Sequence, residues 1–89
     1  MKQQITVEQL NECSKPRKLA TWMDKRHYGL LPTIGQMIEF LDENTKHEFH
    51  IFRRLVDWKI IYEDLYYGKI LGEELCDSLW KAVKEKLET

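Results

Sequence analysis

Three threonines in this chain each stand three positions before a glutamine or glutamate, which is the capping-box pattern of a helix start. In a capping box the threonine hydroxyl accepts a hydrogen bond from the backbone of the third following residue, whose side chain returns a bond to the threonine backbone. The patterns begin at Thr6, Thr33 and Thr45, and apolar residues follow each at helical spacing. They predict helices over about 7–13, 34–43 and 46–67.

Two further helices follow from other signals. Ser14 and Pro16 are typical of a first turn, so we expect a second helix from there to near Tyr28, where Gly29 supplies a left-handed cap. Gly68 and Gly72 predict a turn over 69–71. A terminal helix of about 73–88 is predicted from one apolar stripe, formed by Leu75, Cys76, Leu79, Trp80, Val83 and Leu87.

The segment 46–67 is the richest in apolar residues and is predicted to be a long central helix. On a helix its apolar residues cover roughly 220 degrees of arc, which is wider than a one-sided surface helix needs, so we expect it to pack on two sides. No Asn-Gly or Asp-Gly hairpin turn and no clean alternation indicates strands. The predicted fold is all-α, a compact bundle of four to five helices forming a single helical domain over 1–89.

Composition excludes several classes of protein. With 14 basic and 15 acidic residues the net charge is −1, so no global field attracts nucleic acid or anionic lipid. The two cysteines have no spacing typical of a disulfide framework or a zinc ribbon. The start of the chain lacks the apolar region of a secretory signal, and no stretch reaches the roughly 18–20 apolar residues of a membrane span. We expect a cytoplasmic protein without a membrane partner.

Residues for catalysis or metal binding are few. His47 and His50 have a spacing at which a helix could present both to a metal, with Glu48, Cys13 or His27 as further ligands, but no second ligand pair accompanies them. Cys76 lies on an apolar stripe and is expected to be buried, whereas Cys13 is expected to be accessible. No phosphate loop, dinucleotide motif or nucleophile elbow is present. We therefore predict no enzymatic activity, no cofactor and no metal.

The aromatic surplus of segment 46–67 gives the first functional hypothesis. Aromatic residues are enriched at binding hot spots, and this segment holds more of them than short neighbouring helices would cover. We therefore expect a small helical adaptor or regulator that binds another protein or a second copy of itself. The predicted contact strip is Trp58, Tyr62 and Tyr66, with Arg53 and Arg54 as its polar rim.

A basic segment gives the second hypothesis, a nucleic-acid-binding regulator. Residues 1–29 contain six basic and three acidic groups, and most of the basic ones fall within 15–26. Such a cluster is able to contact phosphates, although it also fits a solvated helix face. The predicted phosphate contacts are Lys15, Arg17, Lys18, Lys25 and Arg26.

Overall fold

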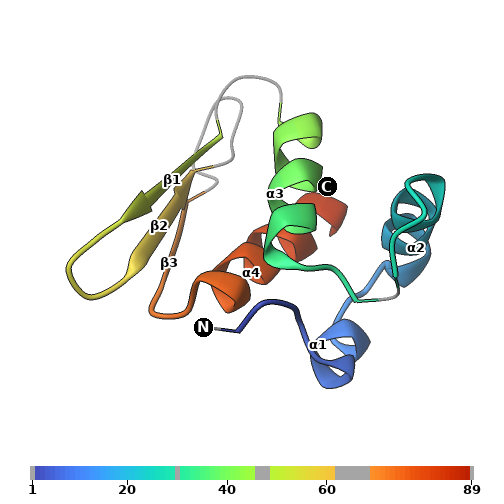
Figure 1. Cartoon of the computed structure of the whole chain (residues 1–89), viewed down its shortest axis with the longest axis horizontal. Coiled ribbons are helices and arrows are strands. Elements are labelled where there is room, and N and C mark those ends of the chain that lie inside the picture. Colours follow the sequence, from blue (N-terminus) through green and yellow to red (C-terminus); the bar gives the residue numbers. More distant parts are fainter. Residues whose placement is uncertain (1, 30, 46–48, 62–68, 89) are drawn as a thin grey trace.

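The computed structural model describes residues 2–29, 31–45, 49–61 and 69–88. In Figure 1 a three-stranded sheet lies on one side of α3 and α4, and α1 and α2 lie on the other. No helix in the described ranges is long and apolar enough to cross a membrane. In chain order the elements are α1 (Val7–Asn11), α2 (Pro16–Lys25), α3 (Ile34–Asn44), β1 (His50–Arg53), β2 (Trp58–Ile61), β3 (Lys69–Gly72) and α4 (Leu75–Glu88).

Two of the three capping boxes form as the sequence predicts. Thr6 Oγ1 accepts a bond of 3.1 Å from the backbone of Gln9, whose side chain returns one of 2.9 Å. Thr33 and Gln36 make the same pair of bonds at the start of α3. α1 ends at Asn11, two residues before the predicted end. The third predicted helix, over 46–67, does not form, because 50–53 and 58–61 are strands, and the bonds of its capping box fall partly on Glu48, outside the described residues.

The end of α2 differs from the sequence prediction. α2 ends at Lys25, and the left-handed residue that follows it is His27, with φ 58°, whereas no described glycine has a positive φ. The backbone of His27 donates to the Asp24 carbonyl and that of Tyr28 to the Met23 carbonyl, each over 3.0 Å. These two bonds are those of a Schellman motif, in which glycine is the usual left-handed residue. Here histidine occupies that position instead of Gly29.

The sheet contradicts the all-α prediction, so the fold is a small mixed α and β structure. The antiparallel order β1-β2-β3 pairs Ile51 with Ile60 and Ile60 with Ile70. Residues 50–53 and 58–61 therefore form strands where a helix over 46–67 was predicted, and 69–71 belong to a strand instead of a turn. The physical reason is the concentration of β-branched and aromatic side chains, which pack well on a pleated surface.

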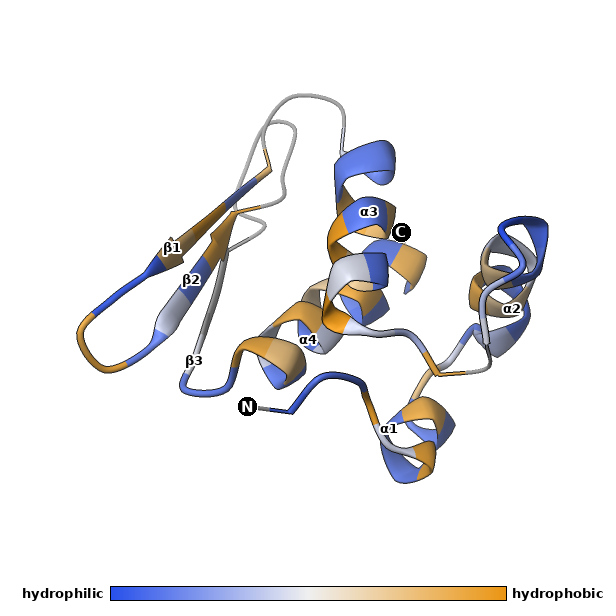
Figure 2. Ribbon diagram, in the orientation of Figure 1, coloured by the Kyte–Doolittle hydropathy of each residue, from blue (hydrophilic) through white to orange (hydrophobic). Residues whose placement is uncertain are grey.

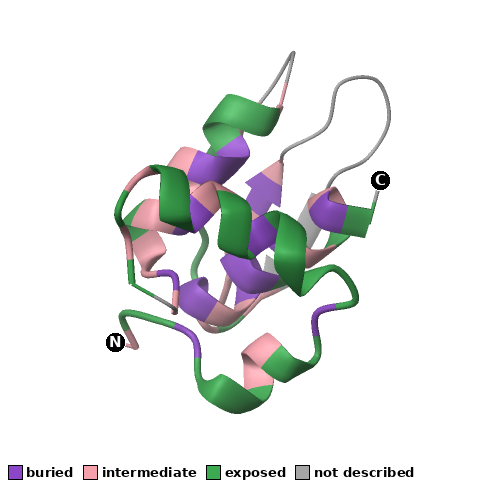
Figure 3. Ribbon diagram, turned by 90° about the vertical axis from the view of Figure 1, so that its right-hand side faces the viewer, coloured by how far each residue is buried: buried purple, intermediate pink, exposed green. Residues whose placement is uncertain are grey.

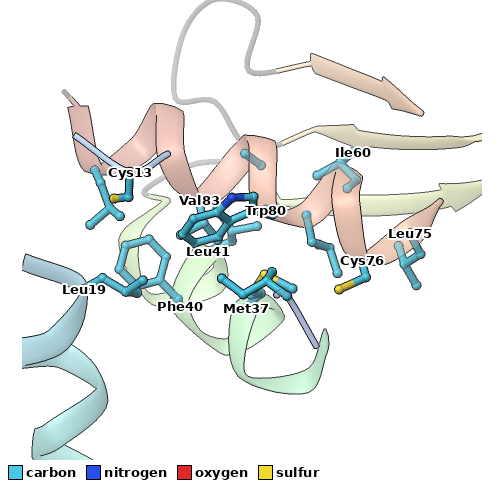
Figure 4. Close-up of a cluster of buried hydrophobic side chains, with 14 of the residues drawn as sticks. Cys13, Leu19, Met37, Phe40, Leu41, Ile60, Leu75, Cys76, Trp80 and Val83 are labelled. Carbon is cyan, nitrogen blue, oxygen red and sulfur yellow. The ribbon is translucent and has the colours of Figure 1, made fainter. Parts of the chain in front are cut away.

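The core lies where α3, α4 and the sheet meet (Figure 3). The predicted stripe of the terminal helix is confirmed, since all six of its residues are buried. Ile60 is the fully buried contribution of β2, and it lies against α4 in Figure 4. Cys13 lies at one end of the same cluster and is buried, so the expectation that it would be accessible is wrong. α3 contributes Met37, Phe40 and Leu41.

Candidate functional site

The turn between β1 and β2 carries apolar side chains into solvent. Arg53 pairs with Trp58 as the last pair of the ladder, and the backbone of Arg54 donates to the Asp57 carbonyl over 2.8 Å. These contacts leave a loop over residues 54–57, with Leu55 and Val56 in its middle. Leu55 is 101% exposed and Val56 is 73% exposed, and Figure 2 shows the end of this hairpin in the hydrophobic colour.

The strand leading into this turn adds an aromatic ring to the exposed surface. Phe52 is 47% exposed and pairs with Lys59 across the ladder. The ring of His50 lies 5.8 Å from that of Phe52, because residues two apart on a strand point to the same face. We call Phe52, Leu55 and Val56 the hairpin patch.

Arg53 and Arg54 flank the hairpin patch, whereas the sequence hypothesis had placed them at the rim of a strip of other residues. The guanidinium of Arg53 lies 5.9 Å from the centre of the Trp58 ring, within the range of a cation–π contact. Arg54 Nε lies 3.0 Å from Asp57 Oδ1, an ion pair that spans the loop. Both arginines are exposed at the base of the turn.

The aromatic strip predicted on a helix over 46–67 does not form as such. Trp58 lies on β2, is only half-buried and packs against the core. Tyr62 and Tyr66 lie outside the described residues. The apolar residues that do reach solvent belong to the hairpin patch, which the helical interpretation had assigned to a packed face. The available signal was the segment 54–57, whose polar ends, Arg54 and Asp57, are typical of a turn even though its two central residues are apolar.

The five basic residues of the second hypothesis are not brought together on one surface. Lys15 and Arg17 are exposed at the start of α2. Lys18 and Lys25 line a hollow of about 250 Å³ that Lys86 of α4 also lines, a residue that the sequence hypothesis did not include. Arg26 faces α3 instead.

Arg26 is held by carboxylates, which removes it from the set of phosphate contacts. Its Nε lies 3.0 Å from Glu39 Oε1, and its terminal nitrogen forms an ion pair with Glu43. The Trp22 indole donates to Glu43 over 2.9 Å, and the Tyr28 hydroxyl donates to Glu39 over 2.5 Å. These five side chains connect the end of α2 to α3.

The titration of this group reflects the same contacts. The hydrogen bond to Glu43 raises the pKa of Arg26, and the same bond lowers the pKa of Glu43. The hydrogen bond to Glu39 raises the pKa of Tyr28, because the carboxylate favours the protonated phenol. The raised pKa of Arg26 and the lowered pKa of Glu43 both favour the charged forms, so these two side chains stay paired around neutral pH.

A second hollow, of about 420 Å³, lies beside α2 on its α1 side. Its lining is mostly apolar, and Asp24 is its one residue with a charged side chain. It brings together no groups suited to acid–base or nucleophilic chemistry. Its apolar lining includes Leu10 of α1 and Pro16, Leu19, Ala20 and Met23 of α2.

The residues considered for chemistry are dispersed. His47 and Glu48 lie outside the described residues, and His50 lies on β1. Within the ranges that the structure describes, no three residues among histidine, cysteine, aspartate and glutamate form a potential metal site. Cys13 and Cys76 are free buried thiols, and burial raises the pKa of Cys76, which disfavours the reactive thiolate.

Comparisons of the chain with protein-family models, curated proteins and solved structures give no match.

Proposed function

We propose that this chain is a small, non-enzymatic protein-binding module that contacts its partner through the hairpin patch. The observation that carries the proposal is the exposure of Leu55 and Val56 at the end of a hairpin. Exposed apolar side chains that gather at one point are typical of interaction sites. Turns favour Gly, Asn, Asp, Ser and Pro, so local turn chemistry does not account for leucine and valine here.

The charge around the patch supports a partner of particular chemistry. β1 and β2 carry Arg53 and Lys59 and contain no acidic residue, and Arg54 extends this basic character into the turn. Asp57 offsets only Arg54, with which it forms an ion pair. Complementary charge favours a protein that offers an apolar hollow bordered by carboxylates. The two arginines then form the polar rim that surrounds the apolar contact.

A different protein fits this surface better than a second copy. In a twofold-symmetric dimer the same patch meets itself. Arg53 and Arg54 of one copy would then approach those of the other, and like charges at an interface are unfavourable. We therefore propose a heterologous, acidic partner. The proposed setting is a reducing compartment such as the cytoplasm, which suits two unpaired thiols.

A site-specific crosslinking experiment tests the proposal. A photo-crosslinking amino acid replaces Leu55 in one variant and Val7 in a control, since Val7 of α1 is also an exposed apolar residue, at 57%. We expect the position 55 variant to crosslink one protein through a segment containing acidic residues. The position 7 variant should not form this adduct.

Affinity for the purified partner then separates the hairpin from the rest of the surface. Leu55→Asp should weaken binding at least about tenfold, as expected for a central contact, whereas Val7→Asp should change it less than about twofold. Binding should also weaken between about 50 and 200 mM salt, because rim charges are screened. Equal effects of the two variants, or a homodimer in sedimentation that Leu55→Asp dissociates, would contradict the proposal.

A further inference from the structure

The hollow of about 420 Å³ beside α2 is large enough for a small organic molecule. Its volume falls within the roughly 300–1,000 Å³ that ligand sites in proteins occupy. We call it the α2 groove. Its described lining comes from α1, from α2 and from the residues that follow α2, namely Leu10, Pro16, Leu19, Ala20, Thr21, Met23, Asp24, Tyr28 and Gly29.

The α2 groove follows one side of α2 along most of the helix. Pro16, Ala20 and Asp24 recur every four residues, which keeps them on the same side. Pro16 is in the first turn and Asp24 is in the last, so the two are about 12 Å apart along the helix axis. The groove therefore suits an elongated molecule better than a compact one.

Most of the lining is apolar. Leu19 and Met23 are buried residues of the core, and Leu10 packs against the same cluster. Pro16 and Ala20 are exposed beside them. A molecule in the groove would gain affinity by removing this apolar surface from water.

Asp24 is the one charged side chain in the lining, and it is exposed. Its backbone carbonyl accepts from His27, but within the described part of the chain its carboxylate forms no hydrogen bond or ion pair. The two hydroxyls of the lining are engaged, since Thr21 donates to the Arg17 carbonyl and Tyr28 donates to Glu39. The carboxylate of Asp24 is therefore the polar group that a ligand would meet.

The basic residues of α2 do not line the groove. Lys18 and Lys25 line the separate hollow of about 250 Å³, and Arg26 is bound to carboxylates of α3. Arg17 lies in the first turn of α2, about 10 Å from Asp24 along the axis. Asp24 lies in the last turn, and the C-terminal end of a helix also attracts cations.

We propose that the α2 groove binds a small organic amine with an apolar body up to about 12 Å long. Its ammonium group pairs with the carboxylate of Asp24, and its body covers Leu19 and Met23. Tyr28 lines the same end of the groove, and aromatic rings attract organic cations. This binding site is separate from the hairpin patch and does not depend on the function proposed for it.

A titration of the full chain, labelled with ¹⁵N and followed by NMR, tests this proposal with three probes that share one body. Phenylbutylamine carries a positive charge, phenylbutanol carries none, and phenylbutyrate carries a negative charge. We expect shifts at residues 10, 17–24 and 28–29. The amine should bind about fivefold more tightly than the alcohol, which is the upper end for an ion pair at an exposed site, and the acid should bind most weakly.

Three results of this titration would overturn the proposal. The first is no shift with the amine up to about 10 mM, where a ligand of this size with ordinary efficiency binds measurably. The second is equal affinity for the amine and the alcohol. The third is a set of shifts confined to other segments.

Matched variants distinguish the groove from a general attraction to negative charge. Asp24→Asn removes the carboxylate of the groove, and Asp42→Asn removes the same charge at an exposed position of α3 outside it. Asp24→Asn should lower the affinity for the amine about fivefold, to that for the alcohol, and Asp42→Asn should change it less than about twofold. Equal losses in the two variants would indicate non-specific attraction instead of a site.

A blocking variant tests where the apolar body lies. Ala20 is exposed and lines the groove, so Ala20→Trp should fill the groove without disturbing the core. Binding of the amine and of the alcohol should both be lost in this variant, and thermal unfolding checks that it folds. Undiminished binding in a folded Ala20→Trp variant would place the probes elsewhere and overturn the proposal.

Discussion

The ammonium nitrogen of Lys2 lies 2.6 Å from Oδ1 of Asp77, so the second residue of the chain is held against the first turn of α4. Gln9 joins them, because its amide donates to the same aspartate oxygen over 2.7 Å and its own oxygen accepts from Lys2 over 2.7 Å. Gln9 is also the third residue of the α1 capping box. One glutamine therefore connects the start of α1 to the start of α4.

This contact predicts a stability effect that depends on pH. The hydrogen bond from Lys2 lowers the pKa of Asp77 in the folded state, so the carboxylate contributes stability above the ordinary aspartate range and loses it as the pH falls. The hydrogen bond to Asp77 raises the pKa of Lys2, whose contribution is lost only as the pH rises through that raised value. Both contributions are therefore present at neutral pH.

Asp77→Asn should lower the free energy of unfolding by about 0.5–1 kcal/mol at pH 7, since both side chains are partly exposed and solvent screens the pair. At pH 3, below the ordinary aspartate pKa, the difference from the unmodified chain should shrink, because the unfolded chain then binds a proton at Asp77 more readily than the folded chain does. Urea unfolding at the two pH values measures this. The same difference at both would show that the charge of Asp77 is unimportant.

The left-handed conformation of His27 predicts a stabilising substitution. A residue with a Cβ in this conformation is strained by roughly 1–2 kcal/mol, and glycine avoids the strain but loses some stability through its flexible unfolded state. We therefore expect His27→Gly to raise the free energy of unfolding by about 0.5–1 kcal/mol.

Gly29 provides a control, because the sequence placed the left-handed residue there and the structure does not. Its φ is not positive, and a Cβ built there would contact nothing within 4 Å. Gly29→Ala should therefore also be tolerated or mildly stabilising, through the unfolded chain alone. Thermal unfolding of both variants measures the effects. A loss of stability in His27→Gly would mean that the histidine side chain supports the end of α2.

Gly72 predicts a destabilising substitution with a specific rescue. A Cβ at this position would overlap Oγ of Ser78 and lie 3.3 Å from its Cβ. Ser78 is buried, and its hydroxyl donates to the Glu74 carbonyl over 2.8 Å, so it has little room to move. Close approach of β3 to α4 therefore requires glycine at position 72.

Gly72→Ala should cost about 1–3 kcal/mol, which is the usual range for overpacking. In the double variant with Ser78→Ala the total should be smaller than the sum of the single effects by about 1 kcal/mol, because the overlapping oxygen is gone. Denaturant unfolding of the four proteins in this cycle gives the coupling. Additive effects would show that the strand and the helix separate enough to accommodate both groups.

The helices were predictable because their signals are local. Thr6 and Thr33 have their bonding partners three residues away, and the stripe of α4 has a period of 3.6 over fourteen residues. The sheet was missed because β1 and β2 are four residues each, too short for alternation to differ from a helical pattern. An apolar arc of roughly 220 degrees was itself evidence against one helix in so small a chain.

The candidate sites depend on long-range contacts, which explains how little of them the sequence predicted. Lys18 and Lys25 share a helix face, so their proximity was foreseeable, but Lys86 lines the same hollow only because the end of α4 lies near Lys18 in the fold. Arg26 resembled its basic neighbours in sequence, but in the fold it forms ion pairs with Glu39 and Glu43 of α3. Proximity of this kind has no signal in one sequence.

Substitution of Leu55 and Val56 in the hairpin patch should weaken partner binding without lowering the free energy of unfolding. Neither Leu55 nor Val56 has a positive φ, whereas the tight turns that best match the twist of a hairpin need positive φ at one or both central positions. Replacing the pair with Asn-Gly supplies residues that adopt this conformation readily and removes two exposed apolar side chains. The free energy of unfolding should therefore stay the same or rise.

Affinity for the partner should fall at least about tenfold in the same variant, because the central apolar contact is lost. Thermal unfolding and binding to the crosslinked partner, measured on one preparation, test both expectations together. Retained binding would show that the turn only connects two strands. A hairpin that stays stable but no longer binds would show that the fold does not need leucine and valine in this turn. Their presence would then be explained by partner binding, since functional residues often occupy positions where the fold favours others.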